Sequence, residues 1–373
     1  MQPVRILFLD YTNGIGLGGG QRSLALLLRH LPRDRYEPLV ACPPGEQLRE
    51  ILPVGVPLLD LTLSPAFTSA SRFSALPTAY GKAVATSLAS VRNLRRLLVS
   101  ERIGLIHANN FKMHLLAALA STGLKVPVLW HVRDIFPSQT AGLLRAASLA
   151  ASRVLTVSRA VAAQFKGCSN VSVVYNAVEL PDAAALEPSP AVTDSAQTTI
   201  GYVGRLDSGK GLDTLIEAFL GLVAEFPHSR LLLAGEGPER KNIPSHPAIE
   251  ILGFQNDLAP VWRQMDLCVQ PSSLPDSFPR SVIEAMSWAK PVVGAGIGGI
   301  PEAIEEGTTG LLFQPGDATG LKTRLQTLLR HPVRARAMGL AGRRRCERLF
   351  SVGAQMEQLN SIYESTTHAI CHS

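Results

Sequence analysis

Two carboxylates, Asp276 and Glu284, stand eight positions apart in the stretch from Pro271 to Glu302. A carboxylate can accept hydrogen bonds from two adjacent hydroxyls, so this pair could hold a polyol such as a ribose or a hexose. The glycines of the following GIGGIPE would let the bare backbone approach a ligand closely. The alternative for each acid is a surface helix whose acidic first turn suits the helix dipole.

Two cations form a second group of side chains that could bind a ligand. Arg205 and Lys210 stand five positions apart in GRLDSGKG, a glycine-bearing loop between a predicted strand and a helix that should begin near Leu212. The unpaired N–H groups and the dipole of a helix N-terminus favour an anion, and both side chains add positive charge. This combination predicts a phosphate site in preference to an ordinary exposed loop.

Two histidines close two predicted strands, His107 in GLIHANN and His131 in VPVLWHVRDIF. Open parallel sheets bind ligands outside the carboxyl ends of their strands, so we expect both histidines and Asn109 near a ligand. A single histidine after a strand is more often a packed or surface residue, but two such positions favour a site. Asp134 could orient His131 or bind an acceptor hydroxyl, and a salt bridge to Arg133 or Arg159 is the alternative.

The elements that would position these groups can be read from hydrophobic patterns. VIEAMSWA, from Val282, predicts a helix, and PVVGA after it predicts a buried strand. Near the N-terminus, VRILFLD predicts a strand and NGIGLGGGQRS leads into a helix. Gly14, Gly16 and Gly19 match G-x-G-x-x-G, but the second strand ends in Cys42 without the acid that a dinucleotide site needs.

A chain of 373 residues is too long for one ordinary core, which predicts two domains. Residues 181–199 are rich in Pro, Ala, Ser and Asp and carry no periodic pattern, so we place the linker there. The expected domains are 1–180 and 200–350, and a last helix from about 351 to 373 is assigned to the first domain through the family resemblance described below.

Composition and charge limit the class of protein. The apolar fraction of 46% indicates an ordered globular protein, and no run of eighteen apolar residues or cleavable signal pattern occurs, so we expect a cytoplasmic protein. Five scattered cysteines share no metal-ligand spacing, which favours reduced thiols. Residues 1–181 carry 19 Lys and Arg against 9 Asp and Glu, while no nucleic-acid motif is present. A basic half of this kind suits phosphates or an anionic membrane surface.

A predicted helix within residues 75–104 has an apolar face beside basic residues, which are Lys82, Arg92, Arg95, Arg96 and Arg102. Such a helix could lie on anionic lipid at the inner face of the cytoplasmic membrane as a peripheral contact. The alternative, which is commoner for this pattern, is an amphipathic crossover helix packed on the sheet.

The stretch from Asp276 to Glu284, with AMSWAKPVV and GGIPE after it, resembles the family 4 retaining glycosyltransferases. GRLDSGKG resembles the diphosphate loop of that family, GGGQRS its N-terminal glycine loop, and WHVRD the segment whose histidine lies near the reacting carbon. Two positions depart from the family pattern. Asp276 stands where the family usually has Glu, and Ala289 stands where Gly is common.

The resemblance implies an α/β fold with two Rossmann-like doubly wound domains facing across a cleft, known as GT-B. It also implies that the loop acid contacts the transferred sugar, the helix acid holds the nucleotide ribose, and the end of the strand IEILGF lies beside the base. As catalytic groups we therefore predict His131, Arg205, Lys210 and Asp276, and as substrate-binding groups Gly18, Gly19, Gly20, His107, Asn109, Asp134, Gly204, Gly235, Gly237, Phe254, Ser277, Phe278, Glu284, Gly298 and Gly299.

The sequence contains no Asp-x-Asp motif and no Cys/His cluster, so we expect no metal and no cofactor. Positive charge on a diphosphate leaving group must then come from Arg205, Lys210 and the helix dipole. The predicted reaction moves a sugar from a nucleoside diphosphate sugar to a hydroxyl of a glycan or lipid-linked acceptor, with retained configuration, in bacterial cell-surface polysaccharide or glycolipid synthesis. The alternatives are a non-catalytic nucleotide-sugar-binding relative and a sugar-nucleotide epimerase of the same fold.

Overall fold

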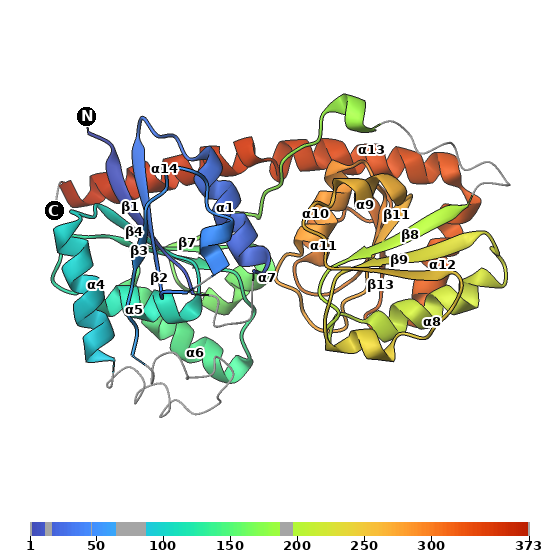
Figure 1. The fold of residues 1–373 in the computed structure, drawn as a ribbon, viewed down its shortest axis with the longest axis horizontal. Helices are drawn as coiled ribbons and strands as arrows, with labels where there is room; N and C mark the ends of the chain where they lie inside the picture. Colours follow the sequence, from blue (N-terminus) through green and yellow to red (C-terminus); the bar gives the residue numbers. More distant parts are fainter. Residues whose placement is uncertain (1, 12–16, 46, 65–86, 187–196, 372–373) are drawn as a thin grey trace. The chain divides into compact units, whose positions relative to one another are not determined.

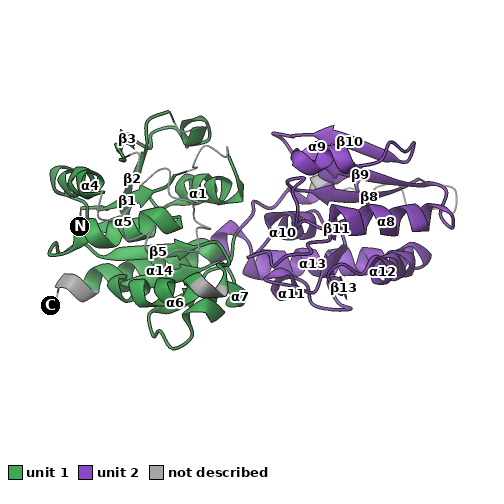
Figure 2. Ribbon diagram, turned by 90° about the horizontal axis from the view of Figure 1, so that it is seen from below, with its two compact units in different colours: residues 1–176, 355–373 green, residues 177–354 purple. Residues whose placement is uncertain are grey.

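The structure of the chain, a computed structural model, describes residues 2–11, 17–45, 47–64, 87–186 and 197–371. The chain forms two compact units, which Figure 2 distinguishes by colour. Unit 1 comprises Met1–Asn176 together with Gln355–Ser373, and unit 2 comprises Ala177–Ala354. The last helix therefore begins in unit 2 and continues in unit 1. Of the predicted linker, residues 187–196 lie outside the described residues.

Unit 1 is built on a seven-stranded sheet with the order β3-β2-β1-β4-β5-β6-β7, in which all neighbours pair in parallel. The strands are β1 (Val4–Leu9), β2 (Tyr36–Cys42), β3 (Leu58–Asp60), β4 (Leu105–Ala108), β5 (Val128–Val132), β6 (Arg153–Thr156) and β7 (Val171–Val173). The inner strands β1, β4 and β5 are almost entirely buried, as expected where helices cover both faces of a parallel sheet.

The helices of unit 1 surround this sheet (Figure 1). They are α1 (Gly19–His30), α4 (Leu88–Ser100), α5 (Phe111–Ser121), α6 (Ser138–Ala147), α7 (Arg159–Ala162) and the larger part of α14 (Val352–Cys371). Side chains such as Asn110 and Ser158 accept a hydrogen bond from the third residue of the helix that follows, which fixes where α5 and α7 begin.

Unit 2 is built on a six-stranded parallel sheet with the order β10-β9-β8-β11-β12-β13. Its strands are β8 (Thr198–Val203), β9 (Ser229–Ala234), β10 (Ile249–Gly253), β11 (Leu267–Gln270), β12 (Val292–Ala295) and β13 (Gly310–Phe313). Its helices are α8 (Leu212–Val223), α9 (Ala259–Gln264), α10 (Arg280–Ser287), α11 (Ile300–Ala303), α12 (Ala318–Arg330) and α13 (Pro332–Leu349).

In each sheet the order of the strands reverses once along the chain, between β1 and β4 in unit 1 and between β8 and β11 in unit 2. Ligands of doubly wound sheets bind outside the carboxyl ends of the strands at such a switch point. The prediction of two Rossmann-like doubly wound domains is confirmed. A ligand site is therefore expected at the loops that follow β1, β4 and β5 in unit 1 and at those that follow β8 and β11 in unit 2.

The observed elements differ from the predicted ones mainly at their ends. Helix α10 begins at Arg280, two residues before the apolar run that predicted it. The helix expected within residues 75–104 is described only from Leu88, because residues 65–86 lie outside the described part, and Lys82 with them. No helix in the described part of the chain has both the length and the apolar character needed to span a bilayer.

Candidate functional site

At the carboxyl edge of the sheet of unit 2, glycines permit neighbouring loops to approach each other closely. A Cβ at Gly235, whose φ is 153°, would overlap the carbonyl oxygen of Gly204, so the turns after β9 and β8 touch there. The N–H of Gly299 donates to the carbonyl of Asp276 at 2.7 Å, and a Cβ at Gly298 would overlap the same carbonyl group. The predicted glycines thus allow close contact between the turns after β8 and β9, and between the loops after β11 and β12.

The predicted cations and the predicted loop acid meet at this edge. The ammonium of Lys210 lies 2.5 Å from Oδ2 of Asp276, and both side chains are largely shielded from solvent. Arg205 forms an ion pair with Asp207 while 59% of its side chain stays exposed. The buried hydroxyl of Tyr202 donates to the carbonyl of Arg205 at 2.7 Å and anchors the loop. The loop therefore carries a largely exposed guanidinium paired with Asp207 and an ammonium paired with Asp276.

Glu284, the predicted ribose ligand, lies in the second turn of α10 and is held by Arg280. The guanidinium approaches Oε1 of Glu284 at 3.0 and 3.1 Å and also donates to the carbonyl of Ala177 at 2.9 Å. Ser281 donates at 2.8 Å to the buried Gln270 at the end of β11. This ties the start of α10 to the sheet. Within the described residues the bonds to the Glu284 carboxylate reach Oε1, so Oε2 can accept bonds from hydroxyls.

The remaining predicted residues of unit 2 flank these groups on the same loops. Gly237 packs directly on the carbonyl of Leu206, and Ser277 packs its carbonyl against the glycine turn after β12. The ring of Phe278 is buried against Phe350 at a centroid distance of 5.3 Å, so only its backbone can face a ligand. Phe254, directly after β10, is 55% exposed, as a residue that stacks on a base would be.

In unit 1, the two predicted histidines contact each other in a fully buried network. Nε2 of His107 lies 3.0 Å from Nδ1 of His131, and Nδ1 of His107 lies 2.7 Å from the hydroxyl of Tyr363 on α14. The guanidinium of Arg133 lies 3.2 Å from Nδ1 of His131 and donates to Asn176 at 2.7 Å. Residues from β4, β5 and α14 therefore build one polar cluster beneath the carboxyl edge of the sheet.

Burial and charge keep these imidazoles neutral. Desolvation, followed by the positive charge of Arg133, lowers the pKa of His107 to about 3 and the pKa of His131 well below its ordinary value. Nε2 of His131 is buried and makes no hydrogen bond with any residue that the structure describes. A buried polar nitrogen without a partner is unusual in a folded protein, so this atom is a candidate ligand contact.

The predicted glycine turn lies beside this network. Gly18 caps α1 and its N–H donates to the side chain of Gln21 at 3.1 Å, while Gly19 opens the helix. Gly20 packs against the side chain of Arg133, with 3.6 Å between a Cβ built there and Cδ of the arginine. Gly14 and Gly16, from the dinucleotide-like pattern, lie outside the described residues.

Asn109 and Asp134 follow β4 and β5 at the same edge. Oδ1 of Asn109 accepts a bond from Arg133 at 3.5 Å, which links the buried asparagine to the histidine network. The carbonyl of Asp134 accepts from Gln164 at 3.3 Å. The structure thus brings Asn109 together with both histidines, and it ties the backbone of Asp134 to the neighbouring helix segment.

Asp10, at the end of β1, is a candidate that sequence reasoning missed. Its Oδ1 accepts bonds from the N–H of Tyr11 at 2.6 Å, from Asn110 at 2.9 Å and from Gln21 at 3.3 Å. Its Oδ2 is buried and has no hydrogen-bond partner among the residues that the structure describes, and burial raises the pKa of this carboxyl. Asp10 lies directly after the first strand and before the glycine turn, and this position could have identified it as a candidate site residue.

Three further residues with roles at these edges were also missed. Arg280 stands four residues before Glu284, a helical spacing that could have suggested the pair. Arg133 was considered only as a salt-bridge partner of Asp134. Tyr363 carries no local signal, because its contact with His107 joins residues 256 positions apart in the sequence.

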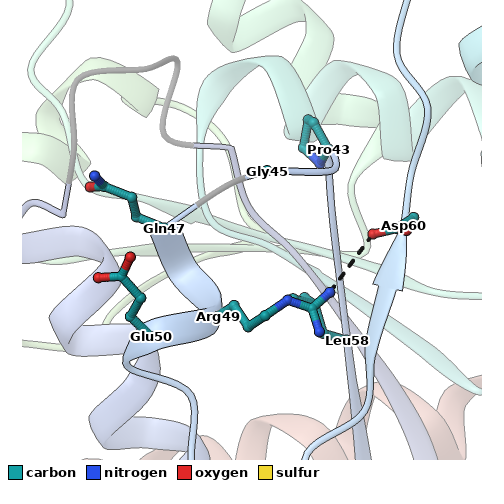
Figure 3. Close-up of a pocket in the computed structure, with 7 residues that line it drawn as sticks. All are labelled: Pro43, Gly45, Gln47, Arg49, Glu50, Leu58 and Asp60. Atoms are coloured by element: carbon teal, nitrogen blue, oxygen red, sulfur yellow. Dashed lines mark ion pairs between the residues drawn. The ribbon is translucent and has the colours of Figure 1, made fainter.

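A separate pocket of about 240 Å³ lies at the carboxyl ends of β2 and β3 (Figure 3). Its lining combines Gln47, Arg49, Glu50 and Asp60, and the guanidinium of Arg49 lies 4.0 Å from Asp60. Polar side chains of both charges suit a hydroxyl-rich ligand. No group of three or more His, Cys, Asp or Glu side chains that could hold a metal ion occurs among the residues that the structure describes.

Comparison with known proteins agrees with this geometry. Residues 197–331 match the family described as glycosyl transferases group 1, and residues 17–181 match glycosyltransferase family 4. N-acetyl-alpha-D-glucosaminyl L-malate synthase of Bacillus anthracis is 29% identical over 206 residues, which is 52% of this chain and 53% of that protein. Sulfoquinovosyl transferase SQD2 of Arabidopsis thaliana is 33% identical over 155 residues, 39% of this chain and 29% of that protein.

The chain thus spans about half of the length of these curated relatives, or less. Among solved structures, HepE of Anabaena in complex with UDP and glucose superposes with a TM-score of 0.78 at 23% identity, covering 97% of this chain and 100% of that one. This likeness concerns the fold. The two family matches, one in each unit, show that the chain belongs to the family 4 glycosyltransferases, group 1.

Proposed function

We propose that the chain is a retaining glycosyltransferase that moves a sugar from a nucleoside diphosphate sugar to an acceptor hydroxyl. The observation that carries the proposal is the meeting of Lys210 and Asp276 at the switch point of unit 2, 2.5 Å apart, with Arg205 exposed on the same loop. A cation and an acid in contact suit the junction between a diphosphate and a sugar, where phosphate oxygens and sugar hydroxyls are adjacent.

The donor would be held by groups of unit 2. Lys210, Arg205 and the N-terminus of α8 supply positive charge for the two phosphates. Oε2 of Glu284 accepts the ribose hydroxyls, and Phe254 stacks on the base. Asp276 accepts hydroxyls of the transferred sugar. HepE has been solved with UDP-glucose, so uridine diphosphate sugars are the first donors to test.

In the proposed reaction, the bond between C1 of the sugar and the diphosphate oxygen breaks, and the acceptor oxygen bonds to C1 from the same face. The proton of the acceptor hydroxyl passes to the departing phosphate oxygen. Lys210 and Arg205 stabilise the negative charge that grows on the diphosphate, and the reaction then needs no divalent ion. His131 donates from Nε2 to a hydroxyl of the sugar or the acceptor.

We further infer a glycan or lipid-linked acceptor, handled at the inner face of the cytoplasmic membrane. Support comes from the pocket at β2 and β3, which suits a sugar ring, and from α4. On that helix Leu88 and Val99 are 60% and 61% exposed, and the exposed Arg92 and Arg96 lie between them on the same face. Apolar and basic side chains on one helix face suit an anionic lipid surface.

The test of this function is a panel of uridine, guanosine and adenosine diphosphate sugars, each incubated with the purified full chain in EDTA. We expect one donor to raise the melting temperature and to be hydrolysed slowly without an acceptor. Binding without hydrolysis or transfer would support the alternative of a non-catalytic relative. Release of an epimerised sugar would support the epimerase. No binding of any donor would contradict the proposed function.

A further inference from the structure

The last helix of the chain contributes one side chain to the buried histidine network of unit 1. Tyr363, from α14, lies with its hydroxyl 2.7 Å from Nδ1 of His107, and Nε2 of His107 lies 3.0 Å from Nδ1 of His131. All three side chains are fully buried. The network therefore runs without interruption from α14 through β4 to β5.

The direction of each hydrogen bond follows from Arg133. A guanidinium only donates, so Nδ1 of His131, 3.2 Å from Arg133, must accept. Nε2 of His107 approaches the same nitrogen and must therefore donate to it. Nδ1 of His107 is then the acceptor for the hydroxyl of Tyr363. The remaining proton of His131 is fixed on Nε2, the buried nitrogen for which the described part of the chain offers no hydrogen-bond partner.

We propose that Tyr363 and His107 are positioning residues that hold His131 in the Nε2–H tautomer, so that it donates to a hydroxyl oxygen of the carbohydrate ligand. The inference rests on the proposed function, because it assigns the ligand to that site. Arg133 disfavours a cationic partner for His131, and an N–H group cannot accept. The partner of Nε2 is thus a hydrogen-bond acceptor, and a sugar hydroxyl oxygen has the lone pairs to be one.

A purely structural role for Tyr363 would not account for this arrangement. Tyr36 packs edge-on against Tyr363 at a centroid distance of 5.4 Å, is buried as well, and its hydroxyl makes no hydrogen bond within the described residues. Tyr36 is thus a neighbouring buried tyrosine whose hydroxyl takes no part in the histidine network. The hydroxyl of Tyr363 instead donates the first hydrogen bond of a series that runs through His107 to His131. The series ends at Nε2 of His131, whose N–H is unpaired among the described residues, and a buried network with an unpaired donor is energetically unfavourable.

The variant Tyr363→Phe removes only the donor to His107, and Tyr36→Phe is the matched control. Without that donor, His107 is free to carry its proton on Nδ1 and to present a lone pair to His131. That lone pair favours a proton on Nδ1 of His131 in competition with Arg133, which still donates to the same nitrogen, so the Nε2–H form of His131 becomes less populated. His107→Gln keeps a donor toward His131, whereas His107→Leu removes it, so the two variants separate donation from packing.

The deciding measurement is a two-bond ¹H–¹⁵N spectrum of the full chain labelled with ¹⁵N-histidine, which needs no substrate. In the wild type and in Tyr36→Phe we expect both His107 and His131 to be Nε2–H tautomers. In His107→Gln we expect the same tautomer at His131. In Tyr363→Phe and His107→Leu, His131 should shift towards the Nδ1–H tautomer. Unchanged tautomers of His131 in both of these variants, with folding verified by thermal melting, would overturn the proposal.

A second readout uses acceptor-free hydrolysis, with UDP-glucose as the probe. We expect Tyr363→Phe to lower kcat about tenfold with an unchanged KM, and Tyr36→Phe to stay within twofold of the wild type. Equal losses in both variants would mean a packing role and would also overturn the proposal. A wild type that hydrolyses no donor would count against the proposed transfer, while the tautomer spectra would still decide the role of Tyr363.

Discussion

The ammonium of Lys210 lies 2.5 Å from a carboxylate oxygen of Asp276, although 66 residues separate them in the chain. The contact joins the loop after β8 to the loop after β11, the two strands that flank the switch point of unit 2. The acid thus neutralises the cation before any ligand binds. A diphosphate that binds must replace Asp276 as the partner of Lys210. The released carboxylate can then accept hydrogen bonds from the sugar attached to the diphosphate.

This competition makes Asp276→Asn informative. The asparagine keeps the size of the side chain and removes the charge that holds Lys210, so a nucleoside diphosphate without sugar should bind about threefold more tightly than to the wild type. Transfer or hydrolysis should fall tenfold or more, because the acceptor for the sugar hydroxyls is weakened. Calorimetric titration with UDP and a hydrolysis assay measure the two effects. Weaker binding of UDP would show that the pair does not compete with phosphate.

Glu284 is expected to hold the nucleotide ribose through the oxygen that Arg280 leaves available. Glu284→Ala should weaken binding of a nucleoside diphosphate tenfold or more, about 1.4 kcal/mol, because two ribose hydroxyls lose their acceptor. Glu217→Ala, at an exposed position of α8, is the matched control and should bind as the wild type does. A Glu284 variant with wild-type affinity would remove this residue from the site.

Ala289 offers a test of local stability. It adopts φ of 53° directly after α10, where the N–H of Ala289 bonds to the carbonyl of Met286 and that of Lys290 to Ala285, the pattern that favours glycine. Ala289→Gly should raise the free energy of unfolding by about 0.5–1 kcal/mol, because the left-handed conformation strains a Cβ. Denaturant titration measures the change.

The matched control for that substitution is Ala337→Gly, at an exposed position inside α13. There glycine should lower the free energy of unfolding by about 1 kcal/mol. The same direction of change at both positions would contradict the explanation from backbone conformation.

The buried histidines predict sensitivity of unit 1 to acid. Burial lowers the pKa of His107 and of His114 to about 3, and that of His131 well below its ordinary value. The unfolded chain binds these protons below a pH of about 6.5 and the folded chain does not, so stability is lost as the pH falls from there towards 3. Each imidazole adds up to about 1.4 kcal/mol per pH unit to this slope.

The raised pKa of Asp10 acts in the opposite direction, because its carboxyl favours the protonated form in the folded state. One such group opposes three histidines, so unit 1 should lose stability on acidification from pH 7 to 5. His114→Gln should flatten the slope, and His228→Gln, at an exposed position of unit 2, should leave it unchanged. Denaturant titrations at pH 7, 6 and 5 compare the variants. Equal slopes for wild type and His114→Gln would contradict the assignment.

The fold and the donor-side loops could be predicted from the sequence because both depend on local patterns. Buried parallel strands are read from apolar runs, and GRLDSGKG keeps its cations close to one helix N-terminus. The pairing of Lys210 with Asp276 could not be read, since it depends on which strands are neighbours in the sheet. Ala289 was noticed as a departure from the family, but only the backbone angle explains why glycine suits that position.

The contacts within the histidine network of unit 1 could not be predicted from the sequence. The positions of His107 and His131 at strand ends suggested a site, yet their direct contact follows from the pairing of β4 with β5. Tyr363 reaches them from the far end of the chain, and no pattern near Tyr363 indicates a polar role. The pocket at β2 and β3 is likewise formed by residues that carry no motif.

The central claim is that unit 2 binds a nucleoside diphosphate through Lys210. Calorimetric titration of UDP, GDP and ADP into the full chain in EDTA, compared between Lys210→Ala and Lys241→Ala, tests it most directly, because Lys241 is an exposed lysine of the same unit. We predict that one nucleotide binds the wild type and Lys241→Ala alike and binds Lys210→Ala at least tenfold more weakly. Equal affinity of the two variants for that nucleotide would contradict the claim.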